Sequence, residues 1–108
     1  MSSVAHWQQN GRVVAIGRLE NYDRALQIAA ALVAGGVRSL EFTLTGKGAF
    51  SAIEKVRGEL GDEAQVGVGT VLSVEDAERA IAAGAEFVVT PAFRPQVIAA
   101  CNRLEIPC

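Results

Sequence analysis

Short apolar runs alternate along this chain with longer segments in which apolar residues recur every three or four positions. The short runs are typical of buried strands, and the longer segments are typical of helices that pack on one face. The expected strands cover residues 12–17, 38–44, 65–71 and 85–90. The expected helices cover residues 21–36, 48–61, 73–84 and 94–105. A short helix is also expected over residues 2–11, and residues 106–108 resemble the opening of a fifth strand.

The helical segments carry recognisable faces and boundaries. Apolar residues mark one face of the first two main helices: Leu26, Ala29, Ala30 and Val33, then Phe50, Ile53 and Val56. Gly35 and Gly36 are expected to end the first of these helices. Ser73 is expected to cap the third helix at its N-terminus, with Asp76 in the first turn.

Strands that alternate with single helices predict a parallel sheet, built either as an open doubly wound sheet or as part of a (β/α)₈ barrel. The strand over residues 38–44 favours the barrel, because Ser39, Glu41 and Thr43 fall on one face and bulky apolar residues fall on the other. The glycine-rich strand "QVGVGTV" would let a ligand or another backbone approach closely. A complete barrel takes about 250 residues. We therefore expect residues 1–108 to form a single domain, an N-terminal half-barrel of a helix and about four βα units.

Composition narrows the class of protein. Half of the residues are hydrophobic and 20% are charged, as in compact folded proteins. Ten Lys and Arg against 12 Asp and Glu leave a net charge of −2, which argues against a nucleic-acid partner. The sequence has no apolar run long enough to span a membrane and no signal-peptide pattern at its start, so we expect a cytoplasmic protein. Cys101 and Cys108 form no metal or disulfide pattern and are expected to be reduced.

Glu41 is the residue that most suggests chemistry, because a carboxylate inside a strand is costly to bury. It is either a strand-end carboxylate that is solvated or bonded to a nearby Arg, or a general acid/base whose pKa is raised by burial. Arg18, Thr70 and Pro91 follow other strands and have plain alternatives as a surface Arg, a loop residue and a strand stop. The two lysines, Lys47 in a loop expected to be mobile and Lys55 on a helix, are poor Schiff-base candidates. The single histidine, His6, allows neither a metal site nor a catalytic triad.

The motifs "VVAIGR", "ALVAGGVRSLEFTLT", "VGVGTVL", "AGAEFVVTPAF" and "IPC" resemble, in order and spacing, the 2-keto-3-deoxy-6-phosphogluconate (KDPG) and 4-hydroxy-2-oxoglutarate (KHG) aldolases, over nearly the whole chain. The resemblance implies a (β/α)₈ barrel and a class I aldolase. Such an enzyme cleaves a 2-keto-4-hydroxy acid to pyruvate and an aldehyde, glyceraldehyde 3-phosphate or glyoxylate, through a lysine Schiff base. It implies no metal or cofactor, a small-molecule substrate, and usually a homotrimer.

The resemblance also assigns roles to residues. Glu41 matches the catalytic glutamate that moves protons to and from the carbinolamine and the substrate hydroxyl. Thr70 and Pro91 match positions that line the pyruvate site, and Arg18 matches a rim arginine that binds a carboxylate or phosphate. Thr45 stands where some members have an arginine, so the substrate carboxylate would be held more weakly there or by Arg18.

The family's Schiff-base lysine lies on the sixth strand, beyond the end of this chain at Cys108. Two interpretations follow. The chain is the acid/base part of an aldolase and is inactive alone, or it is a non-catalytic half-barrel that associates with copies of itself as a dimer or larger. A third interpretation is an enzyme assembled from two copies, with Lys47 recruited as the nucleophile. It requires burial of a loop lysine and is disfavoured.

Overall fold

Three strands form a parallel sheet whose spatial order, β1-β2-β3, is their order in the chain. The structure is a computed structural model and describes residues 12–108, so the helix expected over residues 2–11 and His6 lie outside the described residues. The strands are β1 (Val14–Gly17), β2 (Ser39–Thr43) and β3 (Gln65–Gly69). The helices are α2 (Ala25–Ala34), α3 (Ala49–Leu60), α4 (Val74–Ala83) and α5 (Pro95–Arg103), with a 3₁₀ turn, η1 (Gly61–Glu63).

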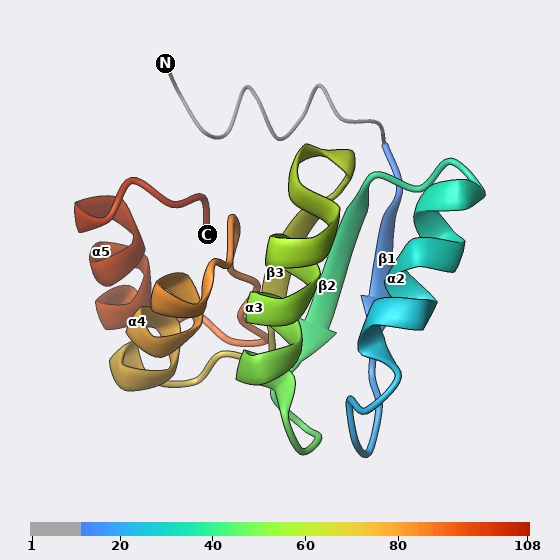
Figure 1. Ribbon diagram of the computed structural model, residues 1–108. Coiled ribbons are helices and arrows are strands. Elements are labelled where there is room, and N and C mark those ends of the chain that lie inside the picture. The colour runs from blue at the N-terminus through green and yellow to red at the C-terminus, as the bar shows by residue number, and fades with distance from the viewer. Residues whose placement is uncertain (1–11) are drawn as a thin grey trace.

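The helices follow one another in chain order along one side of the sheet (Figure 1). Leu40 and Phe42 of β2 and Val66 and Val68 of β3 are all buried, and with α3 residues such as Ile53 they belong to one apolar core. Sequential strand order with neighbouring helices in a single row is consistent with part of a barrel. A doubly wound sheet would instead place helices on both faces.

The segment over residues 85–90, where a full strand is expected, pairs less extensively than predicted. Only an isolated parallel bridge, Val68 to Val88, forms there. Backbone hydrogen bonds still align this segment with β3: Val68 N donates to Phe87 O at 3.0 Å and Val89 N to Val68 O at 2.8 Å. Val88 N in turn donates to Pro107 O at 2.9 Å, which is the only trace of the fifth strand among the described residues. We refer to residues 85–90 as the fourth segment.

The helices begin and end within a few residues of the expected positions. Ser73 caps α4 as predicted, with its Oγ accepting from Asp76 N at 3.1 Å. The predicted face of α2 is wrong at Ala30, which is exposed, whereas Ala25 and Ala29 are buried. The buried stripe of this helix is therefore shifted by about one residue toward Ala25.

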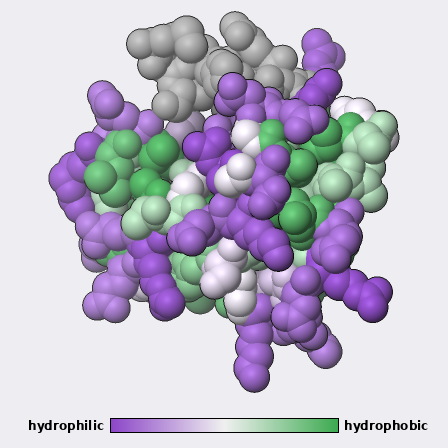
Figure 2. All heavy atoms as spheres, in the orientation of Figure 1, coloured by the Kyte–Doolittle hydropathy of each residue, from purple (hydrophilic) through white to green (hydrophobic). Residues whose placement is uncertain are grey.

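Hydrophilic side chains cover much of the helix side of the molecule, and hydrophobic ones gather mainly toward its two flanks (Figure 2). Among residues 12–108, none of the helices is long and apolar enough to cross a membrane. Cys101 is buried and Cys108 is exposed, and both are free thiols, as expected.

Candidate active site

Four predicted site residues follow the carboxyl ends of successive parallel segments. Arg18 comes directly after β1, Thr45 two residues after β2, Thr70 directly after β3, and Pro91 directly after the fourth segment. Since the carboxyl ends of parallel strands meet at one edge of a sheet, all four lie along the same edge. This is the edge at which ligands bind in parallel α/β folds.

Glu41 lies within β2 on the face of the sheet opposite to Leu40 and Phe42, which belong to the apolar core. Its register partners are Ile16 on β1 and Gly67 on β3, so Ile16 projects from the same face. Glu41 is nevertheless only 6% exposed. Burial raises the pKa of its carboxyl group, and the positive charge of Arg18 opposes that rise in part. A carboxyl group whose pKa is raised by burial, under the influence of a nearby cation, is suited to general acid/base catalysis.

A tyrosine that the sequence analysis did not single out joins the ends of β1 and β2. The Tyr22 hydroxyl lies 2.8 Å from Gly17 O and 2.6 Å from Thr43 O, and 3.2 Å from Thr43 Oγ1. The Thr43 hydroxyl in turn bonds the Thr45 hydroxyl at 2.8 Å. Tyr22 therefore fixes the two strand ends from which Arg18 and Thr45 emerge. The only sequence signal was an aromatic residue shortly after a strand, which does not reveal a partner 21 residues away.

Thr70 has a backbone angle φ of 59°, in the left-handed region that favours glycine. Holding a threonine there costs stability, and strain of this kind is often found at functional sites. Backbone bonds on both sides impose the geometry, because Leu44 N donates to Gly69 O at 2.9 Å and Val71 N donates to Val89 O at 3.2 Å. The loop thus presents the partly buried Thr70 side chain from a tightly defined backbone.

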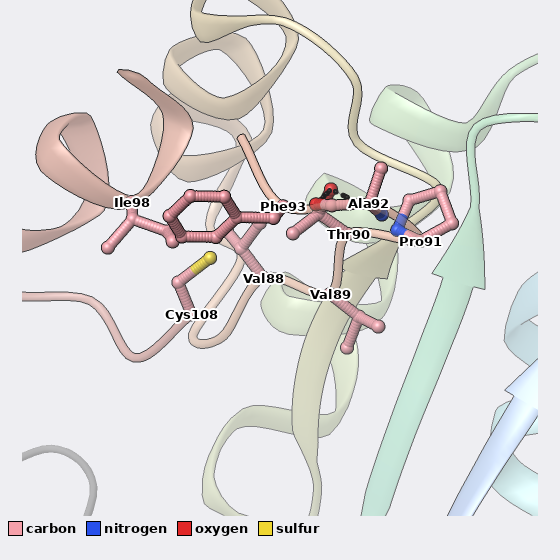
Figure 3. Close-up of a pocket in the computed structure, with 8 residues that line it drawn as sticks. All are labelled: Val88, Val89, Thr90, Pro91, Ala92, Phe93, Ile98 and Cys108. Carbon is pink, nitrogen blue, oxygen red and sulfur yellow. Dashed lines mark hydrogen bonds between the residues drawn. The ribbon is translucent and has the colours of Figure 1, made fainter. Parts of the chain in front are cut away.

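Pro91 borders a separate pocket of about 440 Å³, lined by Val88, Val89, Thr90, Pro91, Ala92, Phe93, Ile98 and Cys108. Figure 3 shows the Phe93 ring and the Cys108 sulfur close to Ile98, and the Thr90 hydroxyl bonded within its own turn to Ala92. Glu41 and Thr70 do not line this pocket. The structure therefore places Pro91 at the common edge but on a mainly apolar hollow beside it.

Neither lysine lies in a buried environment. Lys47 and Lys55 both have exposed side chains. The backbone of Lys47 is nonetheless anchored, since Lys47 N donates to Glu20 O at 2.9 Å and Tyr22 N donates to Lys47 O at 3.0 Å. Within residues 12–108, no group of three or more His, Cys, Asp or Glu side chains is arranged to hold a metal ion.

Comparisons of the sequence and of the structure with known proteins both find aldolases. A model of the "KDPG and KHG aldolase" family matches residues 4–108. The chain is 46% identical over 96 residues to the 2-dehydro-3-deoxy-phosphogluconate aldolase of Treponema pallidum, covering 89% of this chain and 45% of that protein. It is 38% identical over 97 residues to the KHG/KDPG aldolase of Escherichia coli K12, covering 90% of this chain and 45% of that one.

A solved structure of KDPG aldolase from Legionella pneumophila, with pyruvate captured as a covalent carbinolamine, superposes with a TM-score of 0.80 at 32% identity. The match covers 87% of this chain and 45% of that one. The chain thus spans a little under half the length of the relatives it matches. The family model, which covers nearly every residue, shows that the chain belongs to the KDPG and KHG aldolase family.

Proposed function

We propose that this chain carries the acid/base and substrate-binding residues of a class I aldolase. The reaction would cleave a 2-keto-4-hydroxy acid, such as KDPG or KHG, to pyruvate and an aldehyde, glyceraldehyde 3-phosphate or glyoxylate. The observation that carries this proposal is Glu41, a buried carboxyl group with a raised pKa beside the charge of Arg18. Membership of an aldolase family supplies the reaction class.

In this reaction a lysine amine attacks the C2 carbonyl of the substrate to form a carbinolamine, which loses water to give an iminium ion. Glu41 would donate the proton that turns the departing hydroxyl into water. As a carboxylate it would then accept the proton of the C4 hydroxyl as the C3–C4 bond breaks, which releases the aldehyde and leaves an enamine. Arg18 and the Thr45 and Thr70 hydroxyls would bind the substrate carboxylate or its other oxygens, and Pro91 would border the pyruvate moiety.

The lysine is the part of this reaction that the chain does not supply in a suitable place. A Schiff-base lysine needs a lowered pKa, which requires burial or a neighbouring cation, and Lys47 and Lys55 are exposed. We therefore propose that the 108-residue chain alone forms no Schiff base. Borohydride reduction in the presence of pyruvate, followed by intact mass measurement of the chain, should reveal no adduct. A pyruvyl adduct on either lysine would contradict this proposal.

The acid/base role is tested in a fusion of this chain to the remaining half of the Treponema pallidum relative, assayed for release of pyruvate from KDPG and from KHG. The Glu41→Gln variant of the fusion should lose about 10²–10⁴-fold in kcat, the usual contribution of a general acid/base. Glu54→Gln, which removes an exposed carboxylate from α3, is the matched control and should keep full activity. An active fusion whose Glu41→Gln variant retains its activity would reject the proposed role.

A second candidate function is a self-associating half-barrel without catalysis. The observation that favours it is the exposure of large apolar side chains: Ile16 is 64% exposed, Val89 is 40% exposed, and Phe93, which lines the same pocket as Val89, is 81% exposed. Large apolar side chains exposed at the two edges of a sheet are candidates for an interface. Sedimentation of the purified chain tests the candidate, because self-association predicts a dimer or larger and a folded monomer at all concentrations rejects it.

A further inference from the structure

The space beside Glu41 is made by a glycine on the neighbouring strand. β2 and β3 run parallel, with Glu41 opposite Gly67 and Thr43 opposite Gly69. Side chains of register partners project from the same face of a sheet. On this face β3 offers only hydrogen atoms at residues 67 and 69, so its backbone is open to side chains from its neighbours.

The two glycines leave room for different neighbours. A Cβ atom on Gly67 would collide with the ring of Phe87. A Cβ atom on Gly69 would lie 2.7 Å from Glu41 Cδ and 3.0 Å from Glu41 Cγ, and would overlap Oε1. The Glu41 side chain therefore leans along the sheet, past its own register partner, toward the carboxyl edge where Thr70 follows.

The need for glycine at residue 69 is spatial and not conformational. The glycines with positive φ among the described residues are Gly36, Gly48, Gly61 and Gly84. Gly69 lies in regular strand backbone that any residue can adopt. Its lack of a side chain is thus explained by what occupies the place of that side chain, which is the carboxyl group of Glu41.

We propose that Gly69 is a positioning residue for Glu41: its missing side chain forms the slot that holds the carboxyl group against β3 and directs it to the carboxyl edge of the sheet. The catalytic purpose of this slot rests on the proposed aldolase function. The slot itself rests only on the register of β2 and β3 and on the contact between Gly69 and Glu41.

The slot contributes to the burial that raises the pKa of the Glu41 carboxyl group. Burial is the larger influence on the pKa of this carboxyl group and raises it, while the charge of Arg18 lowers it. A methyl group at residue 69 would push the carboxyl group out of the slot and away from β3, so that water could solvate the charged form more fully. The pKa of Glu41 should then fall toward its ordinary value.

The test is a titration of the 108-residue chain followed by NMR of the glutamate side-chain carboxyl carbons, with the Glu41 signal identified by its loss in Glu41→Gln. Gly69→Ala should lower the pKa of Glu41 relative to the unsubstituted chain. Gly67→Ala is the matched control, because it adds the same methyl group to the same strand and face but meets Phe87. The proposal is overturned if folded Gly69→Ala leaves the titration of Glu41 unchanged, or if both variants lower it equally.

A second measurement covers the case in which Gly69→Ala does not fold. In the unsubstituted chain, nuclear Overhauser contacts should join the Gly69 Hα atoms to the Glu41 side-chain methylene protons, and their absence would also overturn the proposal. Neither readout requires catalysis. An inactive fusion enzyme would reject the proposed function while the slot remained, and an unchanged titration would reject the slot while the function remained.

Discussion

At the scale of single residues, the molecule concentrates its unusual environments where the parallel strands end. Glu41 is a buried carboxyl group, Thr70 has a left-handed backbone, and the Tyr22 hydroxyl holds two strand ends together. Each of these costs stability or requires a specific partner. The Tyr22 ring also belongs to the apolar core, where it packs edge-on against Phe42. The proposed acid/base residue Glu41 and the core residue Phe42 therefore lie on opposite faces of one sheet.

The raised pKa of Glu41 makes stability depend on pH. The folded chain binds this proton more tightly than the unfolded chain does, so the contribution is fully present below the ordinary pKa of glutamate and is lost as the pH rises through the raised value. Glu41→Gln stays neutral throughout. The free energy of unfolding of Glu41→Gln, relative to the unsubstituted chain, should increase as the pH rises above the ordinary pKa of glutamate. Urea unfolding across this range measures it, and a difference independent of pH would show that Glu41 is not buried in solution.

The two thiols should differ in reactivity. Burial, together with the neighbouring Cys108, raises the pKa of the Cys101 thiol to about 11, whereas Cys108 is exposed. Because the thiolate is the reactive form, iodoacetamide at mildly alkaline pH should alkylate Cys108 in the folded chain and Cys101 only after denaturation. Peptide mass measurement after timed labelling distinguishes them. Equal labelling rates would indicate that α5 does not protect Cys101.

At the scale of elements, α4 is the one described α-helix whose N-cap side chain makes a hydrogen bond. α4 begins after Ser73, whose Oγ accepts from Asp76 N. Ser73→Ala should lower the free energy of unfolding by about 0.5–2 kcal/mol, the usual cost of a lost N-cap. Ser51→Ala, on the exposed side of α3, is the control and should be neutral or slightly stabilising, because alanine favours helix. Urea unfolding of both variants tests this, and equal effects would mean that the cap contributes nothing.

Much of the element order could be predicted from the sequence, because periodicity and turn residues are local signals. Polar and apolar residues alternate along β2, which placed Glu41 and Phe42 on opposite faces of the strand. Glu41 could therefore be singled out as a candidate functional residue from the sequence. The fourth segment could not be judged locally, because a strand requires neighbours and only one bridge to β3 forms there. The role of Tyr22 and the Gly69 slot depend on loop path and strand register, which no local pattern encodes.

At the scale of the whole molecule, the helices described within residues 12–108 pack along one side of the sheet, and Ile16 on β1 projects from the other side. Matched truncations measure this asymmetry. Ile53→Ala, at a fully buried residue, should lower the free energy of unfolding by about 2–5 kcal/mol, and Ile16→Ala, at a residue 64% exposed, by much less. Urea unfolding at several protein concentrations measures both. A large effect of Ile16→Ala that grows with concentration would show that another copy covers Ile16, and a large effect at all concentrations would contradict the described exposure.

The pairing between the loop after β1 and the loop after β2 has a consequence for recombination among homologues. Lys47 exchanges backbone hydrogen bonds with Glu20 and Tyr22, so each loop satisfies amide and carbonyl groups of the other. A chimera that takes only one of these loops from a different parent would separate it from the loop with which it shares these hydrogen bonds. Loop exchange intended to change specificity at this edge should therefore move both segments together, as one inherited block.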